Sequence, residues 1–164
     1  VADLREFARE GQTEWGNCRL CDCIDSAINL IGSKLPASAH IERRYADLPP
    51  LRGQPVHLSQ VAHALLLNAT LALPATGGRI VVSTGREDEA TQYVEIADNG
   101  CGIAPENLPH VFEPFFTTRE PGRGTGMGLA TCFGIVSEHG GRIEAHSAPG
   151  SGSRFRVTLP ERGA

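Results

Sequence analysis

The chain has 164 residues, of which 40% are hydrophobic and 21% are charged, and its formal net charge is −4. This length suits one domain with a core of its own. The acidic balance and the lack of any basic run exclude a general nucleic-acid binder, and no apolar run approaches the roughly 18 residues that a membrane-spanning helix needs.

The first residues are expected to form the end of a helix. Apolar side chains recur at helical spacing over residues 1–10, and Gly11 follows. The start is polar, carries no signal-peptide pattern and has no initiator methionine. We therefore expect the chain to be part of a longer protein, with residues 12–164 forming the domain proper.

The rest of the chain is predicted to form one layer of helices and one layer of strands. Hydrophobic spacing favours helices over residues 21–34, 57–73 and 127–139. Strands are predicted over residues 15–20, 39–45, 79–85, 92–97, 142–146 and 153–159. Residues 47–55 contain three prolines and are expected to be a loop. The fold class is therefore an α/β two-layer sandwich, with a mixed, mostly antiparallel sheet and helices on one face.

Three of the five cysteines, Cys18, Cys21 and Cys23, form a C-x-x-C-x-C cluster. A structural zinc site needs four ligands, and no second close pair completes the set. We expect reduced, partly buried thiols here rather than a metal site.

A glycine-rich run over residues 122–130 is the most unusual stretch of the chain. Gly122, Gly124, Gly126 and Gly128 alternate over seven residues, and an apolar helical segment follows at once. Free amides ahead of a helix N-terminus suit a phosphate group. By itself, such a run is explained equally well by a flexible loop before a helix.

Two further motifs offer polar groups beside apolar segments. Asn68 lies in the middle of the predicted helix 57–73, where it is either a structural amide or an oxygen ligand for Mg²⁺. The motif from Asp98 to Ile103 follows a predicted strand directly. Its carboxylate can accept a hydrogen bond from an amine such as that of adenine, although an Asp-Asn-Gly sequence alone indicates a simple turn.

Residues 98–125 show little periodicity, and a stretch of this length is often a lid or a binding loop. Three phenylalanines in residues 111–119 would anchor such a lid in one state, or would form a small satellite core. Arg119 and Arg123 lie beside the glycine run, either near a bound triphosphate or in solvent.

The order and spacing of these motifs resemble the ATP-binding domain of sensor histidine kinases, within the gyrase, chaperone and mismatch-repair ATPase superfamily. The resemblance covers about residues 15–160, and the runs FEPFFTT and SAPGSGSRFRVTLP resemble the nitrogen-regulation subgroup. It implies a Bergerat fold with ATP under a lid at about residues 103–125. Residues 1–11 would then be the tail of a dimerisation and phosphoacceptor helix, and residues 12–164 the ATP-binding catalytic domain.

The resemblance also implies roles for individual residues. Asn68 would bind Mg²⁺, Asp98 would read adenine, Gly100 and Gly102 would line the base pocket, and Gly124, Gly126 and Gly128 would contact phosphate. The remaining residues expected at the nucleotide are Ile103, Phe112, Thr117, Arg119, Arg123, Thr125, Met127 and Leu129. No residue is assigned to catalysis itself, because in phosphoryl transfer the protein supplies mainly positioning and charge stabilisation.

The implied partners are an upstream dimerisation and phosphoacceptor domain and a response-regulator receiver domain, and no nucleic acid. The isolated piece would be a monomer and its parent a homodimer. The domain would be cytoplasmic, whether or not the parent is anchored in a membrane.

The chain departs from the family pattern at two positions near Asn68. A polar residue usually stands one helical turn before the metal-binding amide, where this chain has Ala64. A basic residue often follows, where this chain has Leu71 and Ala72. In addition, none of the six histidines has the context of a phosphoacceptor. The alternative function is therefore a nucleotide-binding regulatory module with weak or no kinase activity.

Overall fold

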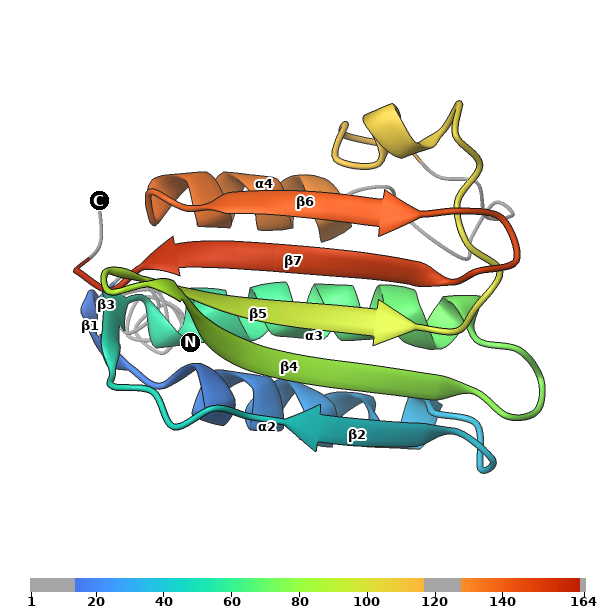
Figure 1. Ribbon diagram of the computed structural model, residues 1–164, viewed down its shortest axis with the longest axis horizontal. Helices are drawn as coiled ribbons and strands as arrows, with labels where there is room; N and C mark the ends of the chain where they lie inside the picture. The colour runs from blue at the N-terminus through green and yellow to red at the C-terminus, as the bar shows by residue number, and fades with distance from the viewer. Residues whose placement is uncertain (1–13, 117–127, 163–164) are drawn as a thin grey trace, which may run out of the picture.

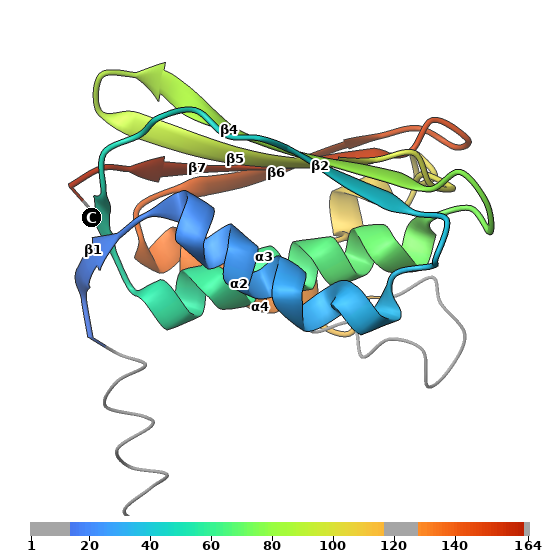
Figure 2. The same ribbon diagram turned by 90° about the horizontal axis from the view of Figure 1, so that it is seen from below.

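The computed structural model describes residues 14–116 and 128–162, which form one sheet layer and one helix layer (Figures 1 and 2). The larger sheet has five strands in the order β2-β4-β5-β7-β6, and a separate two-stranded sheet pairs β1 with β3. The strands are β1 Gly16–Cys18, β2 His40–Arg44, β3 Leu51–Gly53, β4 Arg79–Asp88, β5 Thr91–Asp98, β6 Arg142–Ser147 and β7 Ser153–Pro160. The helices are α2 Leu20–Ile31, α3 Pro55–Ala72 and α4 Gly128–Glu138, with short 3-10 helices η1 Gly32–Lys34 and η2 Leu108–His110.

The large sheet is mixed and mostly antiparallel, as the sequence predicts. β2 runs parallel to β4, and the other three pairings are antiparallel. Figure 2 shows α2, α3 and α4 together on one face of this sheet. The predicted α/β sandwich with helices on one face is therefore confirmed.

The two faces of the sheet differ because side chains alternate along each strand. Residues that face the helices are buried, with Ile80, Ile96 and Phe155 each at most 2% exposed. The opposite face carries paired charges, such as Arg156 with Glu87 at 3.3 Å. The sheet therefore buries one apolar face under the helices and leaves a charged face to solvent.

One predicted loop contains a strand. Within residues 47–55, β3 pairs antiparallel with β1, so that Leu51 lies opposite Cys18. The expectation of an unbroken loop was wrong because three residues carry too little periodicity to indicate a strand, and their partner lies more than 30 positions earlier. Helix α3 also starts two residues before its predicted start, with Pro55 in its first turn, where a missing N–H is tolerated.

The cysteines are all free thiols, and Cys18, Cys23 and Cys132 are buried. Burial raises the pKa of Cys18 to about 11 and that of Cys132 to about 12. These two side chains therefore act as small apolar groups of the core.

The helix predicted over residues 1–10 lies outside the described residues. Within the described ranges, none of the helices is both long and apolar enough to span a bilayer.

A buried histidine joins the end of α4 to the start of α3. His139 is 1% exposed. Its Nε2 accepts the Gln54 backbone N–H at 3.0 Å, and its Nδ1 therefore donates to the Ile135 carbonyl oxygen at 2.8 Å. The Trp15 ring packs against it at a tilt of 38°, with ring centroids 4.6 Å apart. The imidazole is thus neutral, and both of its nitrogens are used.

Replacing His139 with alanine should lower the free energy of unfolding by about 2–4 kcal/mol, because the change opens a cavity and leaves the buried Gln54 amide without its acceptor. Urea unfolding followed by circular dichroism and by the fluorescence of Trp15, the single tryptophan of the chain, measures this loss. The control is His146→Ala, because the His146 side chain is 57% exposed and should contribute less than about 0.5 kcal/mol. Equal effects of the two variants would contradict the structural role of His139.

Candidate functional site

The candidate site lies at one end of the molecule. Figure 1 shows that the ends of β5 and β6, the C-terminal end of α3 and the N-terminal end of α4 meet there. Helix α3 touches both neighbouring segments. The Cys101 N–H donates to the Ala72 carbonyl oxygen at 3.0 Å, and a Cβ on Gly128 would lie 3.9 Å from the Cβ of Ala64.

Asn68 lies between these two contacts of α3. Residues 64, 68 and 72 are spaced by four, so they share one face of the helix. Asn68 is half-buried. The helix therefore places Asn68 between the loop after β5 and the first residue of α4.

Asp98 ends β5 and is only 8% exposed. Its Oδ1 accepts the Gly100 N–H at 2.8 Å, whereas its Oδ2 is buried and has no hydrogen-bond partner among the described residues. Burial raises the pKa of this carboxyl group, and the nearby amides of Gly100 and Ser153 oppose the rise. A buried acceptor of this kind costs free energy unless something donates to it, so Asp98 fits a ligand that carries an N–H.

The two glycines after Asp98 are required by packing. A Cβ on Gly100 would collide with the Ala72 carbonyl oxygen, and one on Gly102 would collide with the Ala148 carbonyl oxygen. Gly102 also has φ +76°, which side-chain-bearing residues rarely adopt. The loop from Asp98 to Ile103, which we call the base loop, is thus held between α3 and the turn that joins β6 to β7.

Polar residues that the sequence analysis missed tie the base loop to its surroundings. Asn99 accepts the Arg79 N–H at 2.7 Å and donates to the Gly77 carbonyl oxygen at 2.9 Å. The Ser147 hydroxyl accepts the Ile103 N–H at 2.7 Å. The Asn-Gly turn and the SAPGSGS run marked both regions as turns, but no sequence signal linked them to each other.

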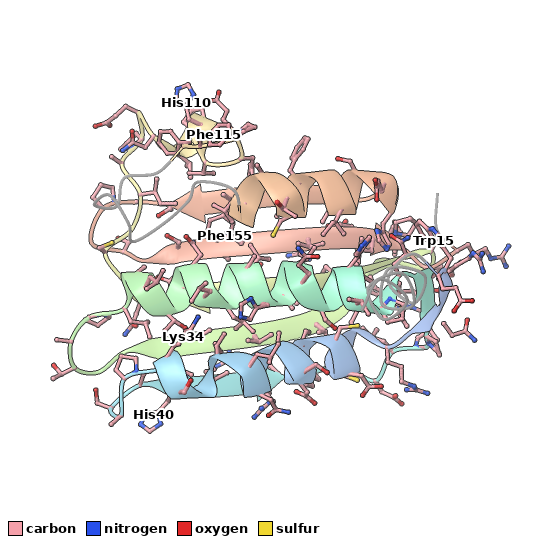
Figure 3. The ribbon with its side chains drawn as sticks, turned by 180° about the vertical axis from the view of Figure 1, so that it is seen from behind. Trp15, Lys34, His40, His110, Phe115 and Phe155 are labelled. Carbon is pink, nitrogen blue, oxygen red and sulfur yellow. The ribbon has the colours of Figure 1, made fainter. Side chains whose placement is uncertain are left out.

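The described part of the predicted lid is partly anchored. Phe112 packs between Phe133 of α4 and Phe155 of β7, at centroid distances of 6.1 and 6.2 Å. In contrast, Phe115 is 76% exposed and has φ +66°. Figure 3 shows Phe155 lying inside, against α4, while Phe115 and His110 lie at the outer edge. Of the three expected apolar anchors, Phe112 and Phe116 therefore pack against the core, and Phe115 does not.

Several predicted nucleotide contacts lie outside the described residues. These are Thr117, Arg119, Arg123, Gly124, Thr125, Gly126 and Met127. Two others are described: Leu129 packs against the core in α4, and Ile103 packs against it at the end of the base loop.

The chemistry of the described residues limits what could hold a metal ion. Among residues 14–116 and 128–162 there is no group of three histidine, cysteine or acidic side chains that could hold one. The Asn68 amide oxygen is the expected protein ligand there. Such a donor suits Mg²⁺, which takes one or two protein oxygens and completes its shell with phosphate and water.

Comparisons with known proteins identify relatives of the whole chain. The sensor histidine kinase ZraS of Klebsiella oxytoca is 35% identical over 166 residues, which cover 99% of this chain and 35% of that protein. The chain thus spans about a third of the length of this relative.

Solved structures agree with this relationship. The mycobacterial sensor histidine kinase MprB matches with a TM-score of 0.78 at 26% identity, covering 92% of this chain and 99% of that one. The catalytic domain of histidine kinase ThkA matches with a TM-score of 0.79 at 25% identity, again covering 92% and 99%. The Bergerat fold and the sequence resemblance are therefore confirmed.

Residues 53–163 match the sequence profile of the histidine kinase-, DNA gyrase B- and HSP90-like ATPases. This range holds α3, the base loop and the start of α4, which are the three segments that meet at the site. The chain therefore belongs to this ATPase family, as an ATP-binding domain of the histidine kinase type.

Proposed function

We propose that this domain binds ATP with the adenine against Asp98 and the phosphates toward the N-terminal end of α4. The observation that carries this proposal is the buried Oδ2 of Asp98, which has no hydrogen-bond partner among the described residues. The exocyclic amine of adenine is a donor of the right kind for it. The N-terminal end of an 11-residue helix favours negative charge at the other end of the nucleotide.

Asn68 is the proposed ligand for Mg²⁺, through its amide oxygen. Its place on α3, between the contacts made by Ala64 and Ala72, puts it between the base loop and α4. A bound Mg²⁺ would neutralise charge on the phosphates. The other nucleotide contacts expected from the sequence, from Ile103 to Leu129, remain part of this proposal.

The parent protein would transfer the γ-phosphoryl group of ATP to a histidine on a helical dimerisation domain, upstream of residue 12. A homodimeric parent would then pass the phosphoryl group to the receiver domain of a response regulator. The relatives that support this scheme are named as sensor histidine kinases. We place the domain in the cytoplasm, with or without a membrane anchor in the parent protein.

Ala64 favours a second candidate function, in which ATP acts as a conformational ligand with weak or no phosphoryl transfer. The Cβ of Ala64 faces Gly128 at the start of α4, one turn before Asn68. This position therefore places a methyl group where a polar side chain could orient a metal-bound water or polarise a nucleophile. Such a change affects turnover more than binding.

Replacing Asp98 with asparagine should weaken the binding of Mg-ATP by about 1.5–3 kcal/mol, because a charge-assisted hydrogen bond to adenine is lost. This corresponds to a dissociation constant roughly 10- to 150-fold higher. Isothermal titration calorimetry on the folded domain measures both values. An unchanged affinity would rule out the role of Asp98, and the absence of binding by the wild type would rule out the nucleotide site as a whole.

The same variant should be at least as stable as the wild type at pH 7 without nucleotide, because it replaces a buried charge with a neutral amide. Burial raises the pKa of Asp98 in the folded state. Ionisation therefore reduces the free energy of unfolding as the pH rises from the ordinary pKa of 3.8 through the raised value. Urea unfolding as a function of pH should show the advantage of Asp98→Asn above this window and none below it. A large loss of stability at pH 7 would contradict the assignment.

Phosphorylation of the full-length parent by γ-labelled ATP separates the two candidate functions. A kinase should acquire acid-labile, base-stable label on a histidine, whereas a regulatory module should bind Mg-ATP without label. Ala64→Asn, which restores a polar group beside Gly128, should raise the labelling rate several-fold and change the dissociation constant for ATP by less than about twofold. An equal labelling rate in both proteins would show that position 64 does not limit turnover.

A further inference from the structure

Three polar residues lie in a row across the end of the large sheet. Asp98 of β5 is directly opposite Ser153 of β7, and Ser153 is directly opposite Ser147 of β6. Directly opposed residues of neighbouring strands point to the same face of a sheet. In this row they point to the helix side, because Ile96 and Phe155, two positions from Asp98 and Ser153, are buried there.

The Ser147 hydroxyl uses its full hydrogen-bonding capacity. It donates to the Gly152 carbonyl oxygen at 2.8 Å and accepts the Ile103 N–H at 2.7 Å. Its oxygen also lies 2.9 Å from the Ser153 hydroxyl. Because the single proton of Ser147 is committed to Gly152, Ser153 is the donor in this last bond.

This one hydroxyl therefore joins three segments: the end of the base loop, the end of β6 and the start of β7. The base loop and the β6–β7 turn also meet through backbone, as in the hydrogen bond from the Gly150 N–H to the Cys101 carbonyl oxygen at 2.9 Å. A Cβ on Gly152 would collide with the Asp98 carbonyl oxygen, so the turn lies directly against the loop. The position of the base loop relative to the β6–β7 turn is thus set by backbone packing and by the Ser147 side chain.

We infer that Ser147 is a positioning residue for the nucleotide, holding the base loop where Oδ2 of Asp98 meets the adenine amine. This inference rests on the proposed function. Removing the hydroxyl leaves the Ile103 N–H without its acceptor and frees Ser153, whose backbone amide lies beside the Asp98 carboxylate. Without these hydrogen bonds the base loop can leave the position that binds adenine. Returning it to that position on binding costs free energy and so lowers the affinity for ATP.

The first test is calorimetry of Mg-ATP binding to the domain and three serine variants. Ser147→Ala should raise the dissociation constant roughly 5- to 20-fold. Ser147→Thr, which keeps the hydroxyl group on a strand residue, should restore binding to within about threefold of the wild type. The matched control is Ser151→Ala, in the same turn, because Ser151 is exposed and should bind like the wild type.

Thermal unfolding of the same proteins distinguishes positioning from a purely structural role. A structural role would lower the melting temperature of Ser147→Ala and leave the affinity of the folded fraction unchanged, which would overturn the inference. Ser147→Cys keeps the volume of the side chain but offers a weak acceptor, so it should weaken binding as alanine does. It serves as the test variant if the alanine variant fails to fold.

The decisive test combines Ser147→Ala with Asp98→Asn in a double-mutant cycle. If Ser147 acts through Asp98, its removal should cost less than about twofold once the carboxylate is gone. The same factor in both backgrounds would overturn the inference. Failure of the wild type to bind Mg-ATP would instead refute the proposed function, whereas normal binding by both the wild type and Ser147→Ala would refute only the role of Ser147.

Discussion

The architecture of the site depends on one contact, that between the last turn of α3 and the loop that follows β5. The hydrogen bond from the Cys101 N–H to the Ala72 carbonyl oxygen, together with the close approach at Gly100, joins the helix layer to the end of the central strand β5. Helix α3 is long enough, at 18 residues, to meet the start of α4 on the same face. Asn68 lies between those contacts and is thus placed between the base loop and the start of α4, which are distant from each other in sequence.

The site combines rigid packing with an unfavourable buried charge. Asp98 is held by β5, by its own bond to Gly100 and by the turn pressed against it at Gly152. Its carboxylate is buried, and this burial raises its pKa. A protein selected only for stability would place a neutral or apolar residue here. The cost is understandable if a ligand donates to Oδ2, since a preorganised acceptor then needs little rearrangement on binding.

The sequence predicts the parts of this structure that depend on local pattern. Helix α3 can be predicted because its apolar residues repeat at helical spacing, and β4 and β5 can be predicted as paired strands. The close backbone approach after Asp98 can be predicted from the spacing of its glycines. Strand β3 cannot be predicted, since it exists only through its pairing with β1. The link from Ser147 to Ile103 arises when two turns, 44 positions apart, are brought together by the sheet. The roles of Asn68 and of the phosphate-binding glycines remain predictions.

The order of strands in the large sheet has a consequence for how the domain behaves in concentrated solution. An open sheet of five strands leaves β2 and β6 with unpaired backbone groups along their outer sides. Such edges invite pairing with other chains. Both strands carry ionised side chains, namely Glu42, Arg43 and Arg44 on one and Arg142 and Glu144 on the other. Pairing edge against edge would strip water from these charged side chains. The charged residues of the outer strands thus protect the domain against aggregation while the sheet itself stays open.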